Sequence, residues 1–204
     1  GVNVNQNAVY MECFMDELAE AAGQDPLAFR MKLLKPKWAA VLKAACDKAG
    51  YGKPLPAGHF HGISQVMGYG SYVAGVAEVS VSPEGALKIH KITAATNPGH
   101  VVNPAQIERQ VAGSFAYGLS AALFGACTVK NGRIEQDNFA SYPVVQMRHM
   151  PKVETLTLPS GGFWGGVGEP TICVAAPAVL NAFAAATGKR IRSFPLKNHN
   201  LQIA

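Results

Sequence analysis

The sequence of 204 residues has little charge, because Asp, Glu, Lys and Arg together make up only 15% of it. Soluble domains usually carry about a quarter. The deficit fits a surface covered by another chain or by the rest of a longer one, and equally an ordinary domain rich in alanine and glycine. The net charge of +5 comes from scattered cations, the densest being "GKRIR" at 188–192. Such a short cluster is typical of a helix C-terminus, so we expect no nucleic-acid partner.

Paired cysteines are also missing. No CxxC motif occurs, which argues against iron–sulfur and zinc-ribbon patterns in this chain. Apolar neighbours predict a buried free thiol at each of the four cysteines, Cys13, Cys46, Cys127 and Cys173. His59 and His61 alternate at the start of a predicted strand, but the pattern indicates no third ligand. We therefore expect surface histidines there and no metal site.

Long apolar runs are absent as well. No stretch approaches the roughly 20 residues needed to span a membrane, and no secretory signal pattern is present. The chain begins with glycine, not methionine, so we expect a fragment or a processed subunit. The compartment stays open between cytoplasm and periplasm of a bacterial-type cell.

The first 50 residues predict helices. Between positions 10 and 34, apolar side chains such as Phe14 and Leu18 recur at helical spacing. Gly23 interrupts this pattern, and Asp25-Pro26 restarts it with an N-cap and a proline at the first helical position. A third helix is predicted over 38–49.

A Gly/Pro-rich link at 51–58 leads to a region of period-two alternation, which predicts strands over 63–70, 72–82 and 86–96. Later patterns predict a helix over 103–124, a hairpin around Asn131-Gly132, a strand over 153–158, a helix from Pro177 to Thr187 and a final strand over 192–196. This order predicts an α+β fold in which a mixed sheet is packed with helices. We expect a helical segment at 1–50 and an α+β portion at 51–204, or one continuous domain.

The stretch "GGFWGGVGEP", residues 161–170, holds five glycines and a single charge, Glu169. A phosphate-binding loop would place Gly-Lys-Ser/Thr here, and a glutamate would repel a bound phosphate, so we exclude that interpretation. The glycines instead suit a backbone that approaches a cofactor closely. Apolar and glycine neighbours predict desolvation and a raised pKa for Glu169, as in a general base. Alternatively, Glu169 only favours the positive end of the helix that follows.

Five stretches, in order, resemble the C-terminal part of the molybdenum-binding subunit of the xanthine dehydrogenase/aldehyde oxidase family. They cover nearly the whole chain: "ECFMDELAEAAGQDPLAFRMKLL", "GSYVAGVAEVSV", "NPGHVVNPAQIERQVAGSFAYGLSAAL", "NFASYPVV" with "MPKVE", and "GGVGEPTICVAAPAVLNAFAAATGKRIRSFPL". The branch most similar acts on isoquinoline-like N-heterocycles. The fold implied is the C-terminal part of a molybdopterin-binding domain.

The resemblance implies roles for particular residues. The family's catalytic glutamate in G-x-G-E falls on Glu169, and its pterin-contacting helix glutamine falls on Gln110. Gly166, Val167 and Gly168 would form the backbone approach to the molybdenum. Two features depart from the family: Asn97-Pro98-Gly99 replaces an Asp-Cys-Gly or Asp-x-Gly turn, and Phe163-Trp164 before the glycines could narrow a substrate channel.

The implied reaction is hydroxylation of the carbon beside a ring nitrogen, with water as oxygen source and Glu169 as general base. The alternatives are an aldehyde oxidoreductase of the same family and a non-catalytic interaction module. The implied cofactor is molybdopterin with molybdenum, in its cytosine dinucleotide form. The implied partners are an N-terminal part of the same subunit and a small subunit that carries iron–sulfur clusters. The implied substrate is a small N-heterocycle or an aldehyde.

Overall fold

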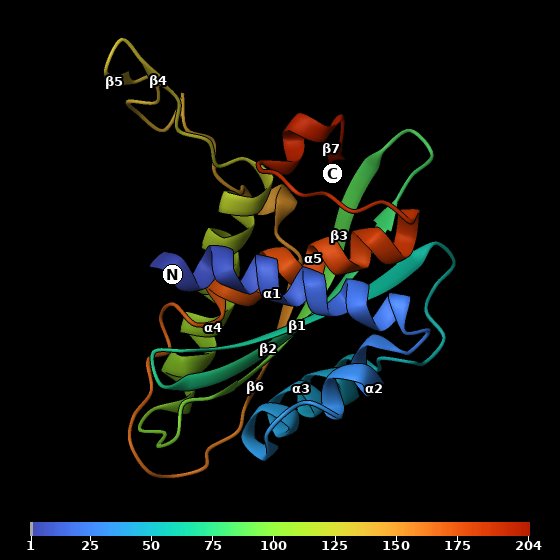
Figure 1. Ribbon diagram of the computed structural model, residues 1–204. Helices are drawn as coiled ribbons and strands as arrows, with labels where there is room; N and C mark the ends of the chain where they lie inside the picture. Colours follow the sequence, from blue (N-terminus) through green and yellow to red (C-terminus); the bar gives the residue numbers. More distant parts are fainter. Residues whose placement is uncertain (1) are drawn as a thin grey trace.

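The computed structural model describes residues 2–204, and it shows a mixed sheet with helices on both faces (Figure 1). The strand order is β1-β2-β3-β6, and β7 also pairs with β3. Neighbours among β1, β2 and β3 are antiparallel, whereas β6 and β7 run parallel to β3. The bounds are β1 His59–Gly68, β2 Ser71–Val81, β3 Ala86–Asn97, β6 Lys152–Thr157 and β7 Gln202–Ile203. The predicted α+β class is confirmed.

Five α-helices surround this sheet, and a small hairpin extends from the body (Figure 1). The helices are α1 Val2–Ala21, α2 Pro26–Met31, α3 Pro36–Ala49, α4 Pro104–Leu123 and α5 Ile172–Thr187. The hairpin is β4 Val129–Lys130 with β5 Arg133–Ile134, and the 3-10 turns are η1 Met147–His149 and η2 Leu196–His199. Among the described residues, no helix combines the length and apolarity that a membrane crossing requires.

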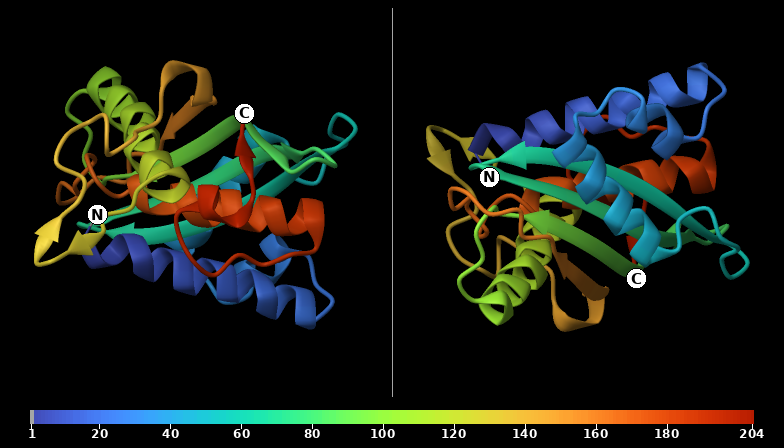
Figure 2. Two further views of the ribbon diagram at one scale, coloured as in Figure 1. Left: turned by 90° about the horizontal axis from the view of Figure 1, so that it is seen from above. Right: turned by 90° about the horizontal axis from the view of Figure 1, so that it is seen from below.

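The sheet separates two apolar cores. On one face, Val41, Leu42 and Ala45 of α3 pack against strand residues such as Ile63 and Val76. On the other face, α4 and α5 bury a larger cluster against β2 and β3. Figure 2 shows α1 running beside α5 on that second face. Burial of apolar side chains on both faces explains why a sheet this hydrophobic is stable.

Helix α5 lies unusually close to the sheet. A Cβ atom at Gly62 of β1 would lie 2.0 Å from the backbone nitrogen of Ala182 and 2.2 Å from the carbonyl oxygen of Ala178. Gly118 of α4 has the same role, because its Cβ would lie 2.7 Å from the Cβ of Ala175. Glycine at these positions lets backbone pack against backbone, and this fixes the position of α5.

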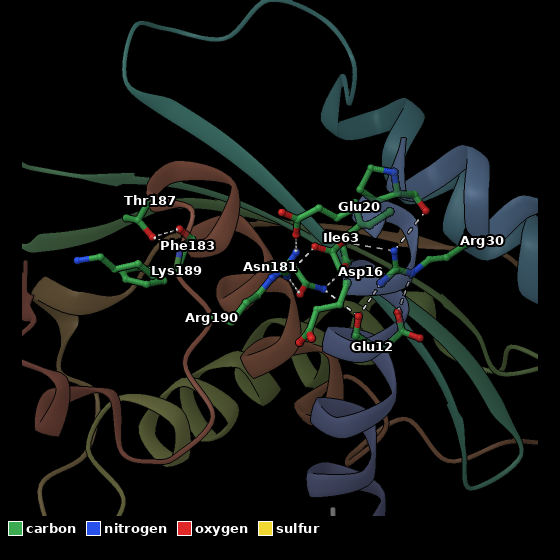
Figure 3. A network of polar contacts seen from close by, with 12 residues as sticks. Glu12, Asp16, Glu20, Arg30, Ile63, Asn181, Phe183, Thr187, Lys189 and Arg190 are labelled. Atoms are coloured by element: carbon green, nitrogen blue, oxygen red, sulfur yellow. Dashed lines mark hydrogen bonds and ion pairs between the residues drawn. The ribbon is translucent and has the colours of Figure 1, made fainter. Parts of the chain in front are cut away.

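A buried polar network joins α1, α2 and α5 (Figure 3). Arg30 is fully buried and donates to the Glu12 carboxylate at 3.1 Å and to the Glu12 carbonyl at 2.7 Å. Asp16 accepts from Arg30 at 3.5 Å and from Arg190 at 2.8 Å. Asn181 of α5 donates to the Glu12 carbonyl at 3.2 Å. Burial raises the pKa of Glu12, and the Arg30 guanidinium opposes that rise.

Near the C-terminus, the predicted helix is confirmed with its end at Thr187 but its predicted start is wrong, and the predicted final strand is wrong. Helix α5 begins at Ile172 and not at Pro177, which lies inside the helix. Residues 173–176 are all buried, so their packing outweighs the backbone hydrogen bond that an internal proline removes. Residues 192–196 form no strand, because Arg192 pairs with Glu17 of α1 through hydrogen bonds of 2.9 and 2.8 Å and holds this segment over the helix.

Several local predictions also change. The first helix begins at Val2, well before position 10, and β1 begins at His59. The interruption at Gly23 and the N-cap at Asp25 are confirmed. Of the four cysteines, only Cys46 and Cys173 are buried, while Cys13 is partly buried and Cys127 is exposed. The expected buried thiol at position 127 is therefore wrong, because that residue follows α4 in a segment outside the core.

The Gly62→Ala substitution should destabilise the fold by about 3 kcal/mol or more, because the new methyl group overlaps the α5 backbone. Gly113→Ala is the matched control, since a Cβ there meets nothing within 4 Å on α4. It should stabilise the chain by about 0.5–1 kcal/mol. Urea unfolding of the two variants measures both effects. Equal stability of the two variants would contradict the close packing of α5.

The Arg30→Met substitution should cost about 3–5 kcal/mol, because it leaves the carboxylates of Glu12 and Asp16 buried without their shared cation. Arg192→Met removes an exposed guanidinium whose partner is Glu17, and it should change the free energy of unfolding far less. Thermal or urea unfolding compares them. A similar loss of unfolding free energy in both variants would mean that burial does not set the strength of the Arg30 network.

Candidate cofactor site

The glycine-rich loop at 158–171 connects β6 to α5 and is anchored by its backbone at two places. The Gly165 N–H donates to the carbonyl of Pro98, just beyond β3, at 2.7 Å. The Gly166 N–H donates to the carbonyl of Tyr69, in the turn between β1 and β2, at 2.8 Å. Trp164 also forms an isolated antiparallel bridge with Gly99. The loop therefore lies across the end of β3 and the turn between β1 and β2.

Glycine is required where this loop meets its supports. A Cβ at Gly165 would lie 2.2 Å from the Ser71 hydroxyl oxygen, and one at Gly99 would lie 2.3 Å from the Phe163 carbonyl oxygen. Gly99 also has a φ of 80°, in the left-handed region that favours glycine. The Asn97 side chain accepts from the Gly99 N–H and from the Ser160 hydroxyl, each at 3.0 Å. The Asn97-Pro98-Gly99 turn thus holds the loop in place.

A hollow of about 300 Å³ opens between this loop and the N-terminal half of α4. Its lining includes Gln106 and Gln110 from α4, His100 from the preceding segment, and Trp164, Gly165 and Val167 from the loop. Gln106 and Gln110 are four residues apart and share one face of the helix. The structure thus brings the predicted residues Gln110 and Val167 to one hollow.

The other predicted loop residues, Gly166, Gly168 and Glu169, do not line the hollow. Gly166 is held between Tyr69 and Ser71, whose hydroxyl donates to the Gly166 carbonyl at 2.6 Å. Gly168 has open space where a Cβ would be. Glu169 is exposed, three residues before the first residue of α5.

The expectation of a raised pKa for Glu169 is wrong for this chain. A hydrogen bond from the Tyr69 hydroxyl holds the pKa of Glu169 below its usual value of 4.5, and the same contact raises the pKa of Tyr69. Desolvation opposes this shift, although the carboxyl group lies at the surface. Sequence neighbours alone suggested an apolar environment, but the glycines of the loop leave the carboxylate open to solvent.

Sequence reasoning missed three residues at this site. Gln106 was detectable, because it precedes Gln110 by one helical turn on the same face. Tyr69 was predicted as part of a strand, although it lies in a turn. His100 packs edge-on against Trp164 with ring centroids 5.7 Å apart, a contact between segments more than 60 residues apart that no local pattern indicates.

The two histidines weighed as metal ligands have other partners. His59 pairs with the Glu78 carboxylate at 2.7 Å and stacks on His90, whereas His61 stacks on Tyr51. Over residues 2–204, no group of three or more His, Cys, Asp or Glu side chains is arranged to hold a metal ion.

The chemistry of the hollow suits a planar heterocyclic cofactor. Glutamine amides both donate and accept hydrogen bonds, as the edge of a pterin ring requires. The Trp164 indole and the His100 imidazole add flat surfaces against which a ring can pack. The donor set therefore fits the organic part of a molybdopterin cofactor, with the glycine backbone at its side.

The fold is of the α+β class, and the hollow lies between its glycine loop and α4. Residues 3–151 match the family described as "Molybdopterin cofactor-binding domain", and the chain belongs to that family. It is a domain of the molybdenum hydroxylases of the xanthine dehydrogenase and aldehyde oxidoreductase type.

Curated relatives agree along most of the chain. The beta subunit of the isoquinoline 1-oxidoreductase of Brevundimonas diminuta is 29% identical, over 97% of this chain and 26% of the relative. The membrane-bound aldehyde dehydrogenase [pyrroloquinoline-quinone] of Gluconacetobacter polyoxogenes is 30% identical, over 92% of this chain and 27% of the relative. The chain thus spans about a quarter of the length of these relatives.

Solved structures share the fold. The aldehyde oxidoreductase of Desulfovibrio gigas matches 96% of this chain and 40% of its own, with a TM-score of 0.75 at 16% sequence identity. The quinoline 2-oxidoreductase of Pseudomonas putida 86 matches 58% of this chain and 16% of its own, with a TM-score of 0.53 at 20% identity. The fold predicted from the sequence, part of a molybdopterin-binding domain, is confirmed.

Proposed function

We propose that this chain forms part of the active site of a molybdenum hydroxylase, with Glu169 as general base. The proposal is supported by the meeting of Gln110 and Val167 in one hollow, since Val167 belongs to the loop that also contains Glu169. These positions come from two segments far apart in the chain. When bound, the molybdenum cofactor would supply the oxygen-transfer and electron-accepting chemistry.

The chain's own residues would bind the cofactor and set its position. The Gln110 amide, supported by Gln106, would hold the pterin ring by hydrogen bonds. The backbone at Gly166, Val167 and Gly168 would approach the metal end of the cofactor, because glycine leaves no side chain in the way. A longer side chain at Gly168 would enter the open space beside the loop.

Glu169 would accept a proton from the attacking water-derived oxygen. Its pKa lies below the usual value of 4.5, so the carboxylate is ionised and able to accept a proton at neutral pH. A base of low pKa has a small driving force for proton abstraction. Another part of the enzyme that covered this loop would desolvate the carboxylate and raise its pKa toward the working pH.

The substrate that we favour is a small aromatic N-heterocycle of the isoquinoline type, oxidised at the carbon next to nitrogen. The relative named for isoquinoline oxidation matches 97% of the chain, and a relative from Pseudomonas putida that is named for nicotinate dehydrogenase matches at 26% identity. Phe163 and Trp164 are exposed aromatic residues beside the site, and a planar ring could stack against them.

Aldehyde oxidation is the second candidate. Relatives named for it include the membrane-bound aldehyde dehydrogenase of Gluconacetobacter polyoxogenes and the aldehyde oxidoreductase molybdenum-binding subunit PaoC of Escherichia coli, at 27% identity for the latter. A chain that binds no molybdenum even in the assembled enzyme would instead be a non-catalytic interaction module. Turnover assays with N-heterocycles and aldehydes side by side separate the first two candidates.

The rest of the site would come from partners. The chain covers about a quarter of its relatives, which supports an upstream part of the same polypeptide as the other wall of the cofactor site. The sequence has no CxxC motif, so a small subunit with iron–sulfur clusters would carry the electrons away. We propose the cytosine dinucleotide form of the cofactor, as the family resemblance implies.

The Glu169→Gln substitution should leave molybdenum content unchanged and lower turnover by about 10²–10⁴-fold, because the amide cannot accept the proton. Turnover per bound molybdenum in the assembled enzyme is the measurement. Glu84→Gln is the control, since this exposed carboxylate lies in the β2–β3 turn at the far end of β2 from the loop. Turnover of Glu169→Gln within a few-fold of wild type would contradict the assignment of Glu169 as general base.

The Gln110→Ala substitution should lower molybdenum content several-fold, up to about ten-fold, because it removes one or two hydrogen bonds to the pterin. Metal analysis of the purified assembly measures the content per chain. Gln24→Ala serves as the control, because this amide lies in the turn between α1 and α2. Equal molybdenum content in both variants would remove Gln110 from the cofactor site.

A further inference from the structure

The tight turn between β1 and β2 places Ser71 directly against the glycine loop. The turn consists of Tyr69 and Gly70, whose φ angles of 54° and 79° are both positive, as two-residue hairpin turns of type I′ require. Ser71 follows as the first residue of β2 and is fully buried. It pairs with Gly68 across the two strands, so the register of the hairpin fixes its position.

Both backbone polar groups of Gly166 are bonded to this turn. The Gly166 N–H donates to the Tyr69 carbonyl at 2.8 Å, and the Ser71 hydroxyl donates to the Gly166 carbonyl at 2.6 Å. A Cβ at Gly165 would lie only 2.2 Å from the Ser71 hydroxyl oxygen, so the loop and the turn are in close contact. Two successive glycines would otherwise leave the backbone free to rotate. The turn therefore holds the loop in one conformation at this point.

The bond to the Gly166 carbonyl also sets the direction of the next N–H group. In a planar trans peptide, the C=O and the N–H that follows it point to opposite sides. Because Ser71 holds the Gly166 carbonyl, the Val167 N–H points away from Ser71. Among the residues that the structure describes, none accepts a hydrogen bond from this N–H, and Val167 lines the hollow. The donor is therefore available to a ligand in the hollow.

We propose that Ser71 is a positioning residue for the glycine loop. Its hydroxyl fixes the peptide between Gly166 and Val167, so that the Val167 N–H donates to an acceptor oxygen of the bound cofactor. The identity of that ligand rests on the proposed function, whereas the hold of Ser71 on the loop does not. A small misplacement of a group at an active site can cost up to about 10²-fold in rate, so Ser71 influences turnover without touching the substrate.

The first test measures amide exchange in the assembled enzyme prepared without cofactor. Ser71→Ala removes the donor and should speed exchange of the amides at 165–166 by about 2- to 10-fold, because the loop loses one hydrogen bond at this point. The amides of Ser160 and Gly161, which donate to the Gly99 carbonyl at 3.0 and 3.1 Å, are the internal reference and should be unchanged. Unchanged exchange at 165–166 would overturn the hold of Ser71 on the loop.

Ser64→Ala is the matched control for this experiment. Ser64 is also fully buried, and its hydroxyl donates to a backbone carbonyl at 2.8 Å, but that carbonyl belongs to Val174 of α5. The control should therefore leave exchange at 165–166 as in wild type. Equal acceleration in Ser64→Ala and Ser71→Ala would mean a general loosening of the fold and would overturn the specific role of Ser71.

A second variant keeps the test decisive if Ser71→Ala does not assemble. Ser71→Cys retains a side chain at this position but offers only a weak donor. Exchange at 165–166 should then be faster than in wild type, and slower than in Ser71→Ala where that variant assembles. Wild-type exchange in Ser71→Cys, with Ser71→Ala unassembled, would overturn the proposal.

The direction of the Val167 N–H is tested by adding the cofactor. In the wild-type enzyme the cofactor should slow exchange of the Val167 amide, because this N–H gains an acceptor. In Ser71→Ala the protection should be smaller, because the peptide is no longer held in one orientation. Equal protection in both enzymes would overturn the positioning of this N–H by Ser71.

The last test measures turnover in the assembled, molybdenum-loaded enzyme. Ser71→Ala should lower kcat per bound molybdenum about ten-fold and leave KM nearly unchanged, whereas Ser64→Ala should leave both nearly unchanged. Faster loop exchange together with wild-type kcat in Ser71→Ala would overturn the positioning role. Retained turnover in Glu169→Gln would instead remove the base of the proposed function, and the exchange data would still decide whether Ser71 holds the loop.

Discussion

The close approach of α5 to the sheet fixes the position of the helix that follows the glycine loop. Gly62 and Gly118 leave no side chain between α5 and its neighbours, so the helix has one position. Asn181 then links it to the buried network around Arg30. Because the glycine loop ends where α5 begins, this packing also sets where Glu169 lies. A substitution that changes side-chain volume at β1 would therefore displace α5 and, with it, the loop at the site.

The candidate site itself depends on backbone contacts more than on side chains. Asn97, Pro98 and Gly99 hold one end of the loop, and the turn at Tyr69 holds the middle. This arrangement explains why a segment with five glycines can still present a carboxylate in a defined position. A hydrogen bond from Tyr69 lowers the pKa of Glu169, and desolvation opposes this shift. The loop is preorganised, and preorganised groups are what a cofactor enzyme needs from its protein.

Most of the fold could be predicted from the sequence, because alternation and capping residues are local signals. The N-cap at Asp25 and the hairpin at Asn131-Gly132 are examples. The start of α5 could not be predicted, since burial of 173–176 by distant elements decides it. The pKa of Glu169 was predicted wrongly for the same reason. The main cause of its shift is Tyr69, which lies 100 residues earlier in the chain. Gln110 and Val167 meet in one hollow because of the way α4 packs. No single stretch of the sequence determines that packing.

Hydrogen–deuterium exchange of the assembled enzyme, with and without molybdenum cofactor, would show whether the cofactor lies between the glycine loop and α4. We expect the cofactor to slow amide exchange at 165–168 and around Gln106 and Gln110, while the exposed face of α1 stays unchanged. Protection confined to other segments, with the loop exchanging equally fast in both states, would contradict it.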